Sequence, residues 1–177
     1  MNKKRASATL SLVQGALIAA LYVAVNYTQE FILPSTTTGP VQFRLSELLC
    51  TFSLFLPAAI PGVTVGCLLS NLVAVGVLPL DIILGTAATL MAAIAAYRLR
   101  NLRICKIPLL SLFMPVIFNA VIIGLELEIF YIEGAFTFTG FFLQAGLVAL
   151  GEFAVCVVLG IPFYLLLSKG HFFNKNT

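Results

Sequence analysis

The chain has 177 residues, of which 60% are hydrophobic and only 10% carry a charge. Its mean hydropathy of +1.07 excludes a soluble globular domain, because a chain of this size cannot bury so much apolar surface in water. The net charge of +3 does not indicate a nucleic-acid partner, since it mostly reflects basic residues that membrane topology keeps in the cytoplasm. The apolar runs are continuous rather than alternating, so we predict an all-α integral membrane protein.

The apolar runs predict a single membrane domain over residues 1–177 with six transmembrane helices. Pro61-Gly62 and Pro79 mark tight turns, and the polar segment 28–44 is long for a membrane loop, so we expect it to form an outer lid. The predicted helices cover residues 10–27, 45–59, 63–78, 80–97, 107–125 and 140–167.

The distribution of basic residues predicts the orientation. Nine of the ten basic residues lie in three clusters, which an even number of crossings places on one side: Lys3, Lys4 and Arg5; Arg98, Arg100, Arg103 and Lys106; Lys169 and Lys175. The positive-inside rule therefore predicts cytoplasmic N- and C-termini for a multi-pass protein of a bacterial plasma membrane. Arg44 is the exception, and with Glu47 three residues later it falls at the outer surface.

Polar residues from five predicted helices lie at or above the bilayer midplane. A buried carboxylate in lipid is costly, so such residues usually face a partner or a wet cavity, which favours one outward-facing pocket. Other interpretations remain open: Arg44 and Glu47 can form a surface ion pair, Asp81 can cap its helix, and the amides can join neighbouring helices. The candidate substrate-binding residues are Gln42, Phe43, Arg44, Glu47, Asn71, Asp81, Asn119, Gln144 and Glu152.

Two predicted helices carry alanines spaced four residues apart. The first helix has Ala16, Ala20 and Ala24, and the fourth has Ala88, Ala92 and Ala96. Small residues at this spacing permit close helix approach, either within the bundle or against another protein, and the spacing alone does not distinguish these.

Several chemistries are not expected. The sequence contains no GxxxxGK[ST] phosphate loop, so this chain cannot by itself be an ATP-driven pump. The four cysteines are widely spaced and the only histidine is His171, so neither a metal site nor a cofactor is predicted.

The stretches GPVQFRLSELL and SNLVAVGVLPLDIILGTAATLMAA resemble the QueT family, and the resemblance covers nearly the whole chain. These proteins are substrate-binding S components of energy-coupling factor (ECF) transporters. Membership implies a six-helix bundle that captures 7-deazaguanine queuosine precursors from outside and performs no chemistry on them. It also implies docking, through the Ala16, Ala20 and Ala24 face, onto a transmembrane coupling subunit driven by two cytoplasmic ATPases.

The residues are compatible with such a ligand. A guanine-like base presents adjacent N–H donors, which one carboxylate, Glu152 or Glu47, can accept in bidentate fashion. An amide can donate to its carbonyl oxygen, an aromatic ring such as Phe43 can cover its face, and Asp81 can pair with a cationic substituent. Three alternatives stay open: an S component for a flavin, thiamine or folate; an intramembrane enzyme, for which no DDxxD-like or histidine cluster is present; and a purely structural subunit.

Overall fold

A computed structural model describes residues 3–34, 36–37, 41–73, 79–132 and 135–169. Apart from one isolated bridge between Ile104 and Ile107, the secondary structure of these residues is helical. The segment η1 is a 3-10 helix, whereas η2 and η3 are π-helical continuations of α4 and α5. The elements are α1 (Lys3–Ile32), η1 (Leu45–Leu54), α2 (Ala59–Val73), α3 (Pro79–Leu99), α4 (Leu109–Glu126), η2 (Leu127–Tyr131), α5 (Phe138–Phe153), η3 (Ala154–Leu159) and α6 (Gly160–Lys169).

Four helices of the described chain are long and apolar enough to cross a membrane. They cover Ser7–Ile32, Leu80–Leu99, Leu109–Phe130 and Phe138–Lys169, the last being one continuous helix through α5, η3 and α6. The segments η1 and α2 are shorter: at about 2.0 Å per residue for a 3-10 helix and 1.5 Å for an α-helix, each spans roughly 20 Å of a core about 30 Å thick.

The second predicted helix, 45–59, therefore differs from the structure. Helical structure stops at Leu54, because Pro57 lacks an amide donor and disfavours the helical conformation of the residue before it. The chain resumes as α2 at Ala59, with Pro61 in the first turn, where a helix needs no donor. The helix expected over 63–78 begins four residues earlier, and its predicted end at 74–78 lies outside the described residues. The first helix continues to Ile32, five residues into the segment 28–44 that was expected to be a loop.

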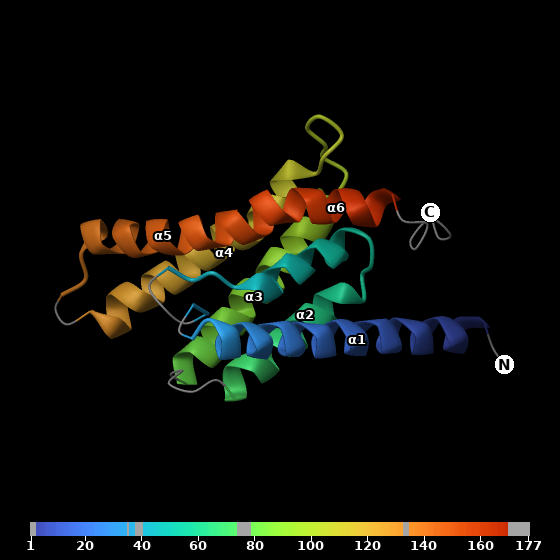
Figure 1. Ribbon diagram of the computed structural model, residues 1–177, viewed down its shortest axis with the longest axis horizontal. Coiled ribbons are helices and arrows are strands. Elements are labelled where there is room, and N and C mark those ends of the chain that lie inside the picture. The colour runs from blue at the N-terminus through green and yellow to red at the C-terminus, as the bar shows by residue number, and fades with distance from the viewer. Residues whose placement is uncertain (1–2, 35, 38–40, 74–78, 133–134, 170–177) are drawn as a thin grey trace.

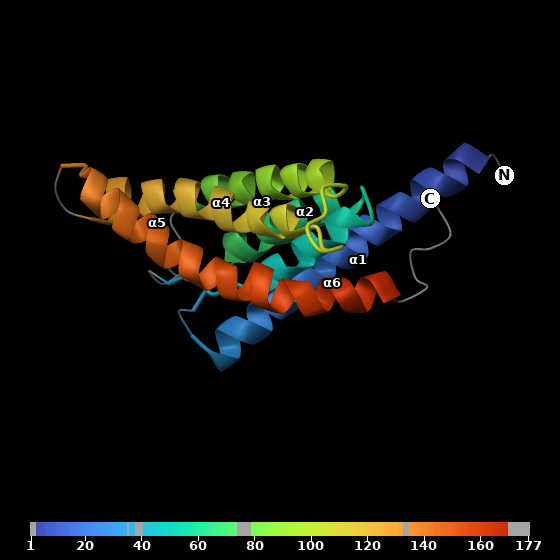
Figure 2. The same ribbon diagram turned by 90° about the horizontal axis from the view of Figure 1, so that it is seen from above.

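The start of α1 and the end of α6 lie at the same end of the bundle (Figure 1). Seen from above, α3 and α4 run side by side, whereas α1 crosses the long helices obliquely (Figure 2). The short segment η1 lies in the interior and contacts α1, α2, α3, α4, η3 and α6. Residues of η1 are therefore positioned to meet side chains from most of the bundle.

Glycines hold α1 and α2 in close contact. A methyl group added at Gly66 would lie 2.6 Å from Tyr22 Cβ, and one at Gly62 would lie 2.7 Å from the carbonyl oxygen of Gly15. Gly62 and Gly66 are four residues apart, which is the small-residue spacing of closely packed membrane helices. The face of α1 that contains Gly15, Ala19 and Tyr22 is consequently its packing face.

The two alanine stripes have opposite environments. On α3, Ala88, Ala92 and Ala96 are fully buried, so this stripe packs inside the bundle. On α1, Ala16, Ala20 and Ala24 are exposed. Packing within the described chain therefore accounts for the first stripe and not for the second.

Candidate functional site

Glu47 is the centre of a buried polar network. It is fully buried on η1, and its Oε1 accepts hydrogen bonds from the Tyr22 hydroxyl at 2.6 Å and the Thr89 hydroxyl at 2.7 Å. Its Oε2 accepts from the thiol of Cys50 at 3.2 Å. Three donors from α1, α3 and η1 therefore converge on this one carboxylate and compensate the cost of burying it.

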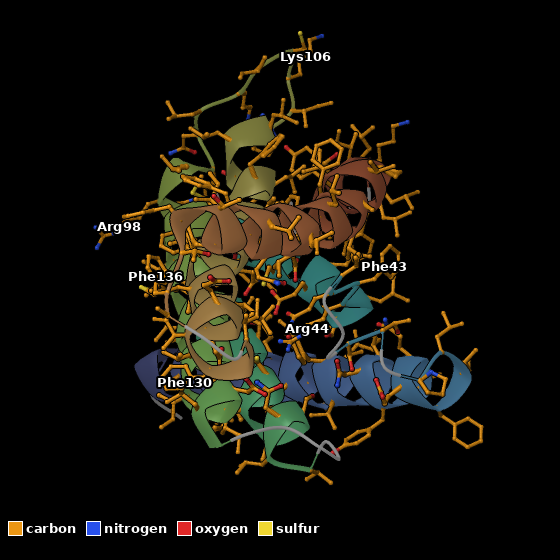
Figure 3. All side chains as sticks on the ribbon, turned by 90° about the vertical axis from the view of Figure 1, so that its left-hand side faces the viewer. Phe43, Arg44, Arg98, Lys106, Phe130 and Phe136 are labelled. Carbon is orange, nitrogen blue, oxygen red and sulfur yellow. The ribbon has the colours of Figure 1, made fainter. Side chains whose placement is uncertain are left out.

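Arg44 lies in the interior rather than on the surface. Its side chain is only 6% exposed, and its Nε donates to the carbonyl oxygen of Thr37 at 2.8 Å. Figure 3 shows Arg44 among the helices, whereas Arg98 and Lys106 lie at the periphery. The Arg44 guanidinium is within electrostatic range of both Glu47 and Glu152, so it offsets negative charge in the interior. The surface ion pair considered for Arg44 and Glu47 is thus not what the structure has.

Glu152 and Asn119 face each other across α5 and α4 with unused hydrogen-bonding capacity. Glu152 is fully buried, its Oε2 accepts from the thiol of Cys156 at 3.4 Å, and the Asn119 amide lies near enough to the carboxylate to interact with it. Within the described residues, neither Glu152 Oε1 nor either polar atom of the Asn119 amide has a well-formed hydrogen bond. Buried polar atoms are usually paired, so unused acceptors and donors in one place indicate a site for a polar ligand.

Asn71 of α2 and Asp81 of α3 lie beside Arg44. Asn71 Nδ2 donates to the backbone carbonyl of Asp81 at 3.4 Å and to the sulfur of Cys67 at 3.6 Å. A methyl group added at Gly85 would lie 3.0 Å from this amide nitrogen and 3.7 Å from Arg44 Nη1. The missing side chain at Gly85 therefore leaves room for the Asn71 amide, and Arg44 Nη1 lies at ordinary contact distance from the same position.

A second acidic residue accompanies Asp81. Glu126 of α4 is 2% exposed and lies within electrostatic range of Asp81 and Arg44, and neither of its carboxylate oxygens has a well-formed hydrogen bond among the described residues. Glu126, which lies in the acidic segment 126–128, was not predicted to be buried. Glu128 in the same segment has a structural partner, because it accepts from the amide and the hydroxyl of Thr137 before α5.

Gln42, Phe43 and Arg44 belong to an irregular segment that crosses the bundle, which we call the strap (residues 41–44). Gln42 is 5% exposed, and its backbone lies so close to Gly151 of α5 that a methyl group there would overlap its carbonyl group. Phe43 is half-buried against the apolar cluster formed by Val116 and Val155. The strap therefore touches α5 one residue before Glu152.

Sequence reasoning missed the residues of α1 that hold the strap. Gln29 donates to the Phe43 carbonyl oxygen and to the Thr36 hydroxyl, and its Oε1 accepts from the Leu45 amide at 2.8 Å. One turn earlier, Asn26 Oδ1 accepts from the Ser46 hydroxyl at 3.3 Å. The signal in the sequence is the spacing of Tyr22, Asn26 and Gln29, which places them on one face of a helix.

The remaining candidates are less closely engaged. Gln144 is half-buried on α5, two turns before Glu152 on the same face, and none of the described hydrogen bonds ties it to the other candidates. Phe130, Phe136 and Phe138 are exposed, as interfacial aromatic residues are, and Figure 3 shows Phe130 and Phe136 at the end of the bundle nearest the viewer.

Outside this interior site, α1 and α2 form an apolar groove of about 240 Å³. Ala16 lines it together with Leu12 and Val65, and Gly15 and Gly62 form its floor. The exposed alanine stripe therefore adjoins a hollow surface.

Comparison with known proteins identifies the family of this chain. Residues 12–169 match the family described as QueT transporter. The "Queuosine precursor transporter QueT" of Lactococcus lactis subsp. cremoris is 31% identical over 157 residues, which cover 84% of this chain and 86% of the relative. No solved structure matches the chain. With its long apolar helices and buried polar interior, the chain belongs to the QueT transporter family.

Proposed function

We propose that this chain is the S component of an ECF-type importer and captures a 7-deazaguanine queuosine precursor at the Glu152–Asn119 site. The observation that carries the proposal is the unused hydrogen-bonding capacity of these two buried residues under the strap. The relative's name refers to a queuosine precursor, and the family resemblance implies that this precursor is a 7-deazaguanine base. The binding site faces outward in a bacterial plasma membrane, and the termini are cytoplasmic.

The geometry favours Glu152 over Glu47 as the carboxylate that reads the base. Glu47 already accepts three hydrogen bonds, whereas Glu152 Oε1 accepts none within the described chain. A deazaguanine presents two adjacent N–H donors to Glu152, and the Asn119 amide donates to its carbonyl oxygen. Arg44, Asn71 and the Asp81–Glu126 pair form the wall beyond, with Gln42, Phe43 and Gln144 at the rim.

The test is ligand-induced thermal stabilisation of the detergent-purified chain by 7-deazaguanine bases, with guanine, riboflavin, thiamine and folate alongside. A ligand that binds only the folded state raises the melting temperature. We expect a shift with the deazaguanines alone. A shift with a different vitamin would replace the substrate class and keep the S-component role, and no shift with any of them would contradict both.

Glu152→Gln tests the site itself. We expect deazaguanine affinity, measured by calorimetry, to fall by more than about tenfold, equivalent to about 1.4 kcal/mol. The control is Glu128→Gln, which changes a buried carboxylate whose partner is Thr137 and should leave the affinity unchanged. Equal affinities of the wild type and Glu152→Gln would assign the ligand to other residues.

Docking onto a coupling subunit with its two ATPases is the second part of the proposal. The exposed Ala16, Ala20 and Ala24 and the adjoining groove support a contact with another helix. We expect Ala16→Trp to abolish uptake in cells that contain the coupling module while leaving ligand affinity intact. Loss of affinity in this variant would instead place α1 in the wall of the binding site.

A further inference from the structure

The strap is fixed at two places on opposite sides of the interior. On the α5 side, the backbone of Gln42 lies directly against Gly151. On the α1 side, Gln29 bonds to the residues on both sides of Arg44, because it donates to the carbonyl of Phe43 and accepts from the amide of Leu45. Arg44 thus lies between these two fixed points of the strap, within electrostatic range of Glu152.

Gln29 makes the α1 contacts with the backbone on both sides of Arg44. Its side chain is 3% exposed, and both ends of its amide are used. The Gln29 Nε2 group also donates to the hydroxyl of Thr36. The backbone carbonyl oxygen of Thr36 accepts from the Phe43 amide at 2.8 Å. The neighbouring contact between Asn26 and Ser46 is longer, at 3.3 Å, and lies beyond the strap in η1. A second tie to α1 runs through Thr37, whose hydroxyl donates to the Glu30 carboxylate and whose carbonyl oxygen accepts from Arg44 Nε. Loss of the Gln29 amide therefore removes the direct contacts between α1 and the backbone of the strap.

We propose that Gln29 is a positioning residue that holds the strap closed over the Glu152–Asn119 site, so that the site opens when the Gln29 hydrogen bonds break. The ligand part of this inference rests on the proposed function. The closure itself does not, because it concerns only the access of small reagents to the interior.

Three native thiols report on this opening. Cys50 bonds Glu47, Cys156 bonds Glu152 and Cys67 accepts from Asn71, and all three are buried among the site residues. Cys105 is exposed, so the measurements use a Cys105→Ser background. The readout is the rate at which a positively charged methanethiosulfonate reagent modifies the buried thiols in micelles, followed by mass spectrometry.

We expect Gln29→Ala to accelerate this modification by about tenfold or more. Gln29→Glu keeps the acceptor for the Leu45 amide but places a second acceptor against the Phe43 carbonyl, and it should accelerate modification as well. The matched control is Gln14→Ala, which shortens a half-buried glutamine of α1 four turns away and should leave the rate unchanged. Equal rates in the wild type and Gln29→Ala would overturn the proposal.

A second control separates opening from general destabilisation. Gly62→Ala disturbs the α1–α2 contact at the carbonyl oxygen of Gly15, away from the strap and from the Tyr22–Glu47 network. If it accelerates modification as much as Gln29→Ala at an equal loss of melting temperature, Gln29 is merely structural and the proposal is wrong.

Ligand release provides the link to transport. With a radiolabelled 7-deazaguanine base, the dissociation rate from Gln29→Ala should rise by about the same factor as the modification rate. Unchanged dissociation despite faster modification would overturn the assignment of the strap as the barrier to release. If no deazaguanine binds even the wild type, the proposed function fails, while the modification rates still decide the role of Gln29.

Discussion

Replacement of Glu47 by Gln tests whether this carboxylate organises the interior rather than binding ligand. The substitution keeps the shape of the side chain and one oxygen that can accept from the hydroxyls of Tyr22 and Thr89. It removes the charge, and it places an amide group opposite the sulfur of Cys50, which is a weak acceptor.

The magnitude follows from the two short hydroxyl contacts. Hydrogen bonds to charged groups contribute about 1.5–3 kcal/mol and neutral ones about 0.5–1.5 kcal/mol, so losing charge assistance at both costs roughly 2 kcal/mol. For a chain of this size, each kcal/mol lowers the melting temperature by about 2–4 °C, so we expect Glu47→Gln to lose about 4–8 °C.

Thermal melting in detergent measures this effect, with Tyr22→Phe as a companion that removes one donor. The two substitutions act on one hydrogen bond, so their double variant should lose less than the sum of the single losses. Tyr27→Phe is the control, since the Tyr27 hydroxyl is buried and has no hydrogen-bond partner among the described residues. An unchanged melting temperature with abolished deazaguanine binding would show that Glu47 is a ligand group and refute the reasoning.

Two further predictions concern glycines. Gly66→Ala should destabilise the protein by about 1–3 kcal/mol, because its methyl group would overlap Tyr22. A methyl group added by Gly146→Ala would meet nothing within 4 Å, so this substitution should stabilise α5 by about 0.5–1 kcal/mol. If Gly66→Ala and Gly146→Ala change the melting temperature in the same direction, the α1–α2 contact is contradicted. Gly151→Ala should displace the Gln42 backbone and accelerate ligand dissociation, and an unchanged dissociation rate would mean that the strap does not cover the site.

Much of the interior was predictable because charge in an apolar run is rare and costly. Glu47 and Glu152 were selected as polar residues at similar depth. Arg44 was selected as the one basic residue outside the three clusters, and the structure places it within electrostatic range of both carboxylates. Asn71 and Asn119 were selected in the same way as the two carboxylates, and both are buried beside that group. Gln144 fits this pattern in the sequence but is only half-buried.

The residues that sequence reasoning missed have polar side chains of types that are expected at their positions in the sequence. Tyr22 and Gln29 lie in or near the first apolar run, where tyrosine and glutamine are expected at a membrane interface. Their roles depend on a partner that is distant in sequence: Glu47 for Tyr22 and the strap for Gln29. Glu126 was missed because its burial depends on α3, which packs against α4.

Composition and the continuous apolar runs alone determined the membrane class and the helical architecture, because lipid penalises each unpaired polar group wherever the chain folds. Only the tertiary structure decided which of two alanine stripes with identical spacing is free. The stripe on α3 is surrounded by neighbouring helices, whereas α1 packs through Gly15, Ala19 and Tyr22 and leaves Ala16, Ala20 and Ala24 exposed. Spacing defines the faces of a helix, but which face is buried depends on the helices that pack against it.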